Sequence, residues 1–270
     1  MATAGWHEGK NLTIDVRYAP DSQEKARSLV AELLALRPDV AVLQAPAVPA
    51  MLETNNPAPV VFLLGGDPVA SKWVQSLAHP GGNLTGFTSA DPSIGAKWVE
   101  YLKEAAPGVR RIAVLANNVV TVYRPHIDAT AQHLGLDVTY FQTESFADIA
   151  AAIAAFASSP FGGLVLPTDA FTTQFRVAIA KKAIECGLPL CSGSDPFAEA
   201  GGLLVYAVDT VDVYRRSAAY VDRILRGTPP GSLPVQRPTV FKFTVNQRTA
   251  RALGLSLPPT LLARADEVIE

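Results

Sequence analysis

Charged residues are scarce in this sequence, and several functional signatures are absent from it. Only 18% of its 270 residues are charged and the net charge is −2, with no lysine- and arginine-rich run that would bind nucleic acid. No stretch is apolar and long enough to span a bilayer, and the first residues lack the basic start and apolar core of a signal peptide. Taken alone, these absences describe a globular cytoplasmic chain without a nucleic-acid partner.

The sequence has only two cysteines, Cys186 and Cys191. An oxidising compartment would allow a disulfide between them. Their expected positions, at the end of a helix and in the next strand, favour two buried thiols instead. No metal-binding spacing surrounds them, and the four histidines are scattered. We therefore expect no metal and no cofactor.

Catalytic motifs are missing as well. The sequence has no G-x-S-x-G elbow, no P-loop and no H-E-x-x-H motif. Gly81 and Gly82 precede a predicted strand, whereas dinucleotide-binding glycines follow one. We therefore expect that the protein is not an enzyme. The alternative, an α/β enzyme acting on a small metabolite, would need a nucleophile, base or metal converging in a cleft, and none is evident.

The sequence does contain a regular alternation of short β-rich runs and helical runs. Strands are predicted at residues 12–18, 40–43, 60–64, 83–87, 111–115, 138–141, 163–166, 188–191 and 203–207. Helices are predicted up to residue 36, after residue 68, and at 94–105, 125–134, 148–157 and 171–186. Strands separated by helices predict parallel sheets with helices on both faces. The fold class is therefore α/β, with doubly wound sheets.

An internal repeat predicts two lobes. Residues 59–86 and 188–206 both read as strand, small-residue turn, Asp-Pro, helical segment, Gly-Gly and strand. The second lobe begins with the strand at 111–115, which has no counterpart in the first. In the strand order 2-1-3-4-5 that strand is central, so the strand at 12–18 would lack a neighbour. We therefore expect a start about 30–40 residues too late, the length of a strand, a crossover helix and a turn.

Polar residues follow five predicted strands, at the edge where open α/β sheets bind ligands. They are Gly66 and Asp67, Thr88 and Ser89, Asn117 and Asn118, Thr168 and Asp169, and Ser194 and Asp195. Each pair also opens or precedes a helix, so helix capping explains them equally simply. Asp169 is the best placed for a ligand, because Ala170 and Phe171 intervene before the predicted helix is established.

The chemistry of these candidates suits binding and not bond breaking. Hydroxyls and helix N-terminal N–H groups would bind a carboxylate, and a carboxylate such as Asp169 would bind an ammonium. An aromatic side chain such as Tyr206 would cover an apolar part of the ligand, although it would fit a core equally well.

Several stretches are specific to one family when taken together. They lie at residues 8–18, 66–69 (Gly-Asp-Pro-Val), 79–86 (His-Pro-Gly-Gly-Asn-Leu-Thr-Gly), 200–203 (Ala-Gly-Gly-Leu), 220–227, 233–236 and 252–269. Through them, essentially the whole chain resembles the ABC-transporter substrate-binding proteins that include tryptophan- and tyrosine-binding members. That resemblance implies the periplasmic-binding-protein type I fold, with lobe one at 1–87 and 209–235 and lobe two at 88–208 and 236–270.

The resemblance also implies a function. The protein would be the solute-binding component of an ABC importer, closing its lobes on a small polar or amino-acid-like ligand and docking on a permease. It would be monomeric and periplasmic or otherwise extracytoplasmic, and family members begin with an export segment and a first strand that this sequence lacks. Asp169 stands in the family's Pro-Thr-Asp motif, which makes it an expected amine contact, while Ala170 replaces a residue that is often polar in relatives. Ligand identity therefore stays open, with an aromatic or other amino acid as first candidate.

The ligand-sensing domain of a transcription regulator is the other alternative, because such domains share this fold. The absence of a helix-turn-helix before residue 12 argues against it.

Overall fold

The computed structural model describes residues 1–18, 23–116 and 119–270, and the chain divides into two compact units. Unit 1 comprises Met1–Ala90 and Asp209–Pro238, and unit 2 comprises Asp91–Val208 and Thr239–Glu270. The chain therefore passes between the units three times, after residues 90, 208 and 238. The family resemblance implied passages after residues 87, 208 and 235.

In the described part of unit 2, seven strands form one sheet in the order β10-β9-β8-β7-β6-β4-β5. The strands are β4 (Arg111–Ala116), β5 (Asp137–Gln142), β6 (Gly162–Leu166), β7 (Leu190–Ser192), β8 (Leu204–Val208), β9 (Phe241–Asn246) and β10 (Glu267–Ile269). The five strands from β5 to β8 are parallel and have the predicted order 2-1-3-4-5. An antiparallel strand, β9, then extends the sheet beyond β8. The predicted α/β class is confirmed.

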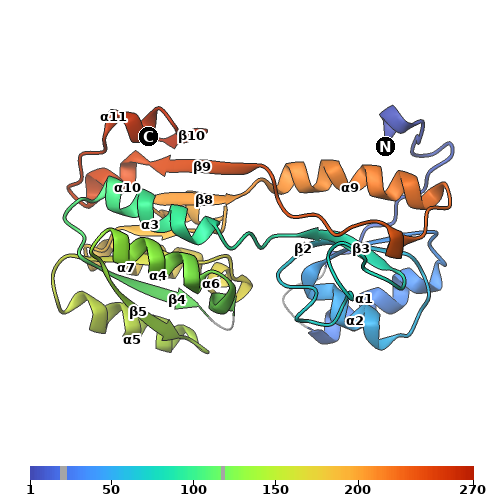
Figure 1. Cartoon of the computed structure of the whole chain (residues 1–270), viewed down its shortest axis with the longest axis horizontal. Coiled ribbons are helices and arrows are strands. Elements are labelled where there is room, and N and C mark those ends of the chain that lie inside the picture. The colour runs from blue at the N-terminus through green and yellow to red at the C-terminus, as the bar shows by residue number, and fades with distance from the viewer. Residues whose placement is uncertain (19–22, 117–118) are drawn as a thin grey trace. The chain divides into compact units, whose positions relative to one another are not determined.

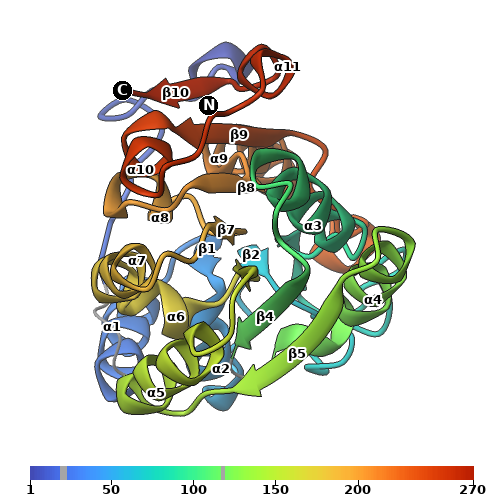
Figure 2. The ribbon, with the colours of Figure 1, turned by 90° about the vertical axis from the view of Figure 1, so that its left-hand side faces the viewer.

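Helices cover both faces of the unit 2 sheet (Figure 2). One face carries α3 (Ile94–Ala105), α4 (Arg124–His133), α10 (Gln247–Ala252) and α11 (Pro259–Leu262), and the other carries α5 (Phe146–Ala157), α6 (Ala170–Gln174), α7 (Arg176–Glu185) and α8 (Phe197–Ala200). Strand β4, which lies between β5 and β6, contributes to both layers: Ile112 and Val114 pack into one core and Ala113 and Leu115 into the other. Alternate residues of β4 face opposite layers, and because both faces of a parallel strand are covered, all four of these side chains are apolar.

The predicted helix at 171–186 is interrupted. Phe175 has φ −96° and ψ 12°, outside the helical region, so α6 ends before it and α7 begins after it. The break leaves α6 as a short separate helix directly after the loop that carries Asp169.

Unit 1 contains a smaller parallel sheet. Its described strands are β1 (Ala41–Gln44), β2 (Val60–Gly65) and β3 (Leu84–Thr88), hydrogen-bonded in that order. Side chains of α1 (Gln23–Ala35) and α2 (Val48–Glu53) pack with these strands into one apolar core, and α9 (Thr210–Leu225) lies against β2 and β3 (Figure 1). Short 3₁₀ turns occupy Ala2–Ala4, Ala45–Ala47 and Pro230–Ser232.

The predicted strand at residues 12–18 is wrong. Leu12 forms one isolated bridge with Glu8, and the described residues 13–18 have no strand structure. Ile14 and Val16, which the alternating pattern assigned to a buried face, are 50% and 54% exposed. A strand forms only where a neighbour accepts and donates its backbone hydrogen bonds, and no described strand lies beside this segment.

The predicted helix after residue 68 is also wrong. Asp67 Oδ1 accepts from the N–H groups of Val69 and Ala70, and Lys72 is left-handed with φ 58°. These turns replace the helix. Two apolar side chains of this segment still reach the core, since Val74 is buried and Trp73 packs edge-on against Phe62 with 5.6 Å between ring centroids.

Both cysteines are free thiols in the structure. Cys191 lies on β7 and is fully buried, and its burial raises the pKa of the thiol. Cys186 ends α7 and is partly exposed. The expectation of two buried thiols is therefore confirmed for Cys191 and wrong for Cys186.

Candidate functional site

The carboxyl ends of β6 and β7 bring several of the predicted residues together in unit 2. Asp169 follows β6 and is only 7% exposed. Its carboxylate accepts hydrogen bonds from the backbone N–H of Phe171 at 3.1 Å and of Thr172 at 3.2 Å, which makes Asp169 the N-cap of α6. The expectation that two residues separate Asp169 from the helix is wrong, because α6 begins at Ala170.

Two threonine hydroxyls link the loop after β6 to the loop after β7. The Oγ1 of Thr168 donates to the carbonyl oxygen of Gly193 at 2.8 Å. The Oγ1 of Thr173 lies 2.6 Å from the carbonyl oxygen of Asp169 and 3.0 Å from the Oγ of Ser194. Asp169 and Ser194, predicted from separate strands, therefore belong to one connected polar cluster.

Aromatic side chains lie beneath this cluster. Trp98 is fully buried, its ring centroid is 4.9 Å from that of Tyr123, and its Nε1 donates to the carbonyl oxygen of Tyr206 at 2.8 Å. Burial is the largest effect on Tyr123 and raises its pKa to about 12, so its phenol stays protonated at neutral pH. The aromatic side chains next to the polar cluster are therefore uncharged.

Gly193 makes this close packing possible. A Cβ atom at this position would lie 2.3 Å from Cζ2 of Trp98 and 2.8 Å from Oγ1 of Thr168. Any larger residue would have to displace the indole ring or the loop that leads to Asp169.

Tyr206 lies elsewhere. It occupies the middle of β8, and its ring packs against Tyr101 at 5.3 Å and Phe241 at 5.5 Å between centroids. These rings belong to the core on the α3 face of the sheet. The structure therefore places Tyr206 in a partly buried aromatic cluster and not among the polar residues after β6 and β7.

The unit 1 candidates also meet at one sheet edge, because β2 and β3 are parallel neighbours. Gly66 and Asp67 follow β2, and Ser89 N donates to the carbonyl oxygen of Gly65 at 2.7 Å. Thr88 is buried, with its Oγ1 accepting from Ala90 N at 2.9 Å. Asp67 shapes its own turn, as described above, which is the capping explanation. In unit 2, Asp195 lies next to Ser194 and is partly exposed, whereas Asn117 and Asn118 lie outside the described residues.

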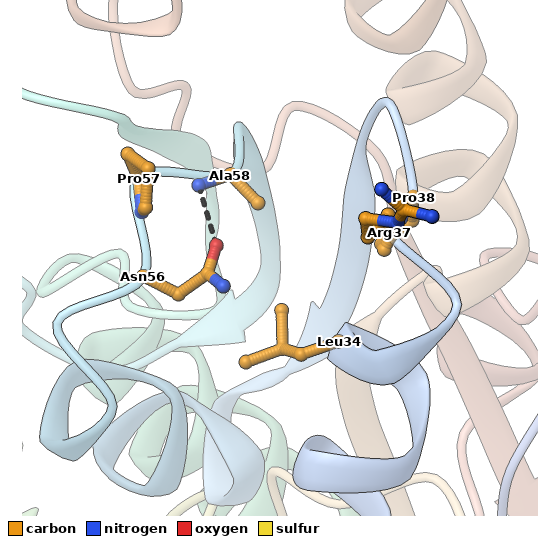
Figure 3. A pocket seen from close by; sticks show the side chains of 6 residues that line it. All are labelled: Leu34, Arg37, Pro38, Asn56, Pro57 and Ala58. Carbon is orange, nitrogen blue, oxygen red and sulfur yellow. Dashed lines mark hydrogen bonds between the residues drawn. The ribbon is translucent and has the colours of Figure 1, made fainter.

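Two surface hollows lie at the opposite edges of the sheets. In unit 1, a hollow of about 260 Å³ lies between the segments that precede β1 and β2 (Figure 3), and its lining residues are Leu34, Arg37, Pro38, Asn56, Pro57 and Ala58. In unit 2, a hollow of about 210 Å³ lies beside the starts of β6 and β7. Both are at the amino ends of strands, away from the candidate residues, and open parallel sheets bind ligands at the carboxyl ends.

Residues 1–269 match the family model described as ABC transporter substrate binding protein. The chain belongs to this family. A tyrosine-binding protein of Clostridioides difficile is 23% identical over 255 residues, which cover 93% of this chain and 73% of that protein. The crystal structure of a conserved domain protein from Vibrio cholerae is 27% identical with a TM-score of 0.86, covering 99% of this chain and 90% of that chain. The structure of an ABC domain in complex with L-Trp from Streptococcus pneumoniae is 24% identical with a TM-score of 0.87, covering 99% and 91%.

Membership of the ABC transporter substrate-binding family confirms the predicted fold and function. The fold is the periplasmic-binding-protein type I fold, and the protein is a substrate-binding component, which favours that interpretation over an enzyme or a regulator. The family implies a small-molecule ligand, a permease partner and a place outside the cytoplasmic membrane. Within the described ranges, no helix combines the length and hydropathy of a membrane span. In the same ranges, no three His, Cys, Asp or Glu side chains gather as metal ligands would.

Three residues of this substrate-binding protein's candidate site carry no motif in the sequence. Thr173 could have been found from its position four residues after Asp169, which places it one helical turn away. Gly193 stands between two serines after a strand, a place where glycine indicates close packing. Trp98 gives no local signal, because only the packing of α3 against β7 brings it to Gly193.

Proposed function

We propose that this substrate-binding protein binds an amino acid, with an aromatic side chain as the first candidate, and that Asp169 receives the ammonium group. The observation that carries the proposal is the buried carboxylate of Asp169 at the carboxyl edge of the unit 2 sheet. A carboxylate with little exposure attracts a cation more strongly than a solvated one, because less water screens the charge. The N-terminus of α6 holds this carboxylate in place through two backbone N–H groups.

Neighbouring hydroxyls support the same ligand class. Ser194 and Thr173 lie within one hydrogen-bonded cluster with Asp169 and offer donors and acceptors to a polar ligand group. The tyrosine-binding relative and the structure with L-Trp support aromatic amino acids as the first compounds to test. Thr88 and Ser89 in unit 1 are further candidate contacts, with Gly66, Asp67 and Asp195 at the same kind of edge.

We further infer that the protein works as a monomer outside the cytoplasmic membrane and delivers its ligand to an ABC permease. The family supports the permease and the extracytoplasmic place. The candidate clusters support the monomer, because each forms from strand ends and loops of one unit of this chain.

The test compares Asp169→Asn and Asp169→Ala with the parent protein. Asparagine caps helices about as well as aspartate, so Asp169→Asn removes the charge and keeps the cap, whereas Asp169→Ala removes both. We expect both variants to weaken binding of L-tryptophan or L-tyrosine by about tenfold or more, the size of one lost charge-assisted contact. Calorimetric titration measures this, with Asp148→Asn, an exposed aspartate in the first turn of α5, as the control.

Two outcomes would count against the proposal. Unchanged affinity in Asp169→Asn would remove Asp169 from the site. A parent protein that binds no amino acid at millimolar concentration would contradict the ligand class while leaving the family assignment in place.

A further inference from the structure

One polar cluster in unit 1 contacts all three segments through which the chain leaves or enters that unit. The segments are the end of β3, the start of α9 and residues 233–238. Both backbone groups of Gln236 form hydrogen bonds with β3: its N–H donates to the carbonyl oxygen of Gly86, and its carbonyl oxygen accepts from Thr88 N–H, each at 2.9 Å. Phe87 and Gln236 form an isolated parallel bridge at this point.

Arg216 of α9 connects to both of the other segments. Its guanidinium donates to Oε1 of Gln236 and lies over the ring of Phe87, 5.4 Å from the centroid. One turn earlier, Asp212 lies 3.6 Å from the same guanidinium, and the two side chains are only 25% and 17% exposed. Partial burial makes this contact stronger than an exposed ion pair, because solvent screens it less.

The amide of Gln236 is used at both ends. Its Oε1 accepts from Arg216 and its Nε2 donates to the hydroxyl of Tyr220 at 3.0 Å. That hydroxyl donates to the carbonyl oxygen of Pro234 at 2.5 Å, and the ring of Tyr220 packs 4.9 Å from that of Phe87. Removing either Arg216 or Gln236 would leave a partner without its hydrogen bond, which costs more than the bond itself contributes.

We propose that Arg216 and Gln236 are positioning residues that hold the three joining segments together, and that ligand affinity depends on them without direct contact. Segments between two units absorb the backbone changes when such proteins close on a ligand. Segments that are bonded to one another at a shared anchor must change their backbone conformation together, whereas unconnected segments can change independently. The part of this inference that concerns affinity rests on the proposed function, and the part that concerns the anchor does not.

The experiment measures backbone hydrogen exchange and binding in Arg216→Met, Arg216→Lys and Gln236→Leu. Arg215→Met is the matched control, because Arg215 is the exposed neighbour on the same helix. We expect exchange at the amides of Thr88 and Gln236 to rise about tenfold or more in Arg216→Met and Gln236→Leu, the effect of losing one hydrogen bond to a charged group. Arg216→Lys keeps the charge but loses the fork, so its effect should be smaller.

Binding is measured with L-tryptophan and with tryptamine, which lacks the carboxylate. A positioning role predicts that Arg216→Met lowers the affinity for both probes by the same factor. It also predicts that the double variant Arg216→Met/Gln236→Leu binds them no more weakly than the single variants do. Exchange unchanged from the parent at Thr88 and Gln236 would overturn the anchor. Loss confined to L-tryptophan would show instead that Arg216 binds the ligand carboxylate. If the parent protein binds neither probe, the proposed ligand class fails, and the exchange rates alone still decide the anchor.

Discussion

Replacing Gly193 by alanine tests the packing beneath the candidate site. The added methyl group would lie 2.3 Å from Cζ2 of Trp98, 2.8 Å from Oγ1 of Thr168 and 2.9 Å from the backbone nitrogen of Thr168. All three distances are shorter than any carbon contact can sustain, and one partner is backbone. Adding a methylene to a tightly packed core costs about 1–3 kcal/mol, and we expect Gly193→Ala to fall in that range.

Chemical and thermal unfolding measure the effect. Each kcal/mol lowers the Tm of a domain of this size by roughly 2–4 °C. The control is Gly108→Ala in the same unit, because a Cβ at Gly108 meets nothing within 4 Å and its backbone is not left-handed. Gly193→Ala should also weaken ligand binding, because the added methyl group would displace Thr168, whose hydroxyl donates to the Gly193 carbonyl oxygen and joins the loops of Asp169 and Ser194. Equal stability of the two variants would refute the close contact between Gly193 and Trp98.

Three further predictions concern other parts of the chain. Ser145 and Asp148 form a reciprocal capping box at the start of α5, so Ser145→Ala should lower the free energy of unfolding by about 1 kcal/mol in urea titrations. A thiol reagent should modify Cys186 and spare Cys191 in the folded protein, because burial raises the pKa of Cys191 and excludes the reagent; equal reaction rates would contradict this. Hydrogen bonds from Trp6 and Arg226 lower the pKa of Asp222 below its ordinary 3.8, so this aspartate stabilises the fold above pH 3.8 and the effect is lost as the pH falls through the lowered pKa. In an NMR titration, Trp6→Phe should raise the pKa of Asp222 toward 3.8.

The strand order of unit 2 could be predicted because each of its parallel strands carries its own signal. Strands such as β4 and β6 are short apolar runs followed by helical periods, and the right-handed crossover rule then leaves few possible orders. The antiparallel strand β9 was not predicted from these patterns, since it enters the sheet only after the chain has passed through unit 1.

Two elements of unit 1 show where local pattern fails. Residues 12–18 alternate like a strand, but a strand also needs a neighbour, which no local pattern supplies. The segment after Pro68 has the spacing of a helix, but the side chain of Asp67 competes for its first N–H groups and Lys72 turns the chain.

The candidate site was predictable to the extent that strand ends determine it. Parallel strands bring their carboxyl ends to one edge, which places Asp169 near Ser194 from sequence alone. The hydrogen bond between Thr173 and Ser194 depends on where α6 begins, and the positions of Trp98 and Tyr123 next to the cluster depend on how α3 and α4 pack. Tyr206 shows the converse, because an aromatic residue on a strand next to the site packs into the core.

The most direct test of the central claim is a thermal-shift screen of this protein against amino acids, small carboxylates, nucleosides and sugars. A ligand at 100 times its Kd stabilises the folded state by about 2.7 kcal/mol, which raises Tm by roughly 5–10 °C. We predict a saturable rise with L-tryptophan or L-tyrosine that Asp169→Asn reduces. A rise with sugars or nucleosides alone, or a rise with amino acids that Asp169→Asn leaves unchanged, would contradict the account.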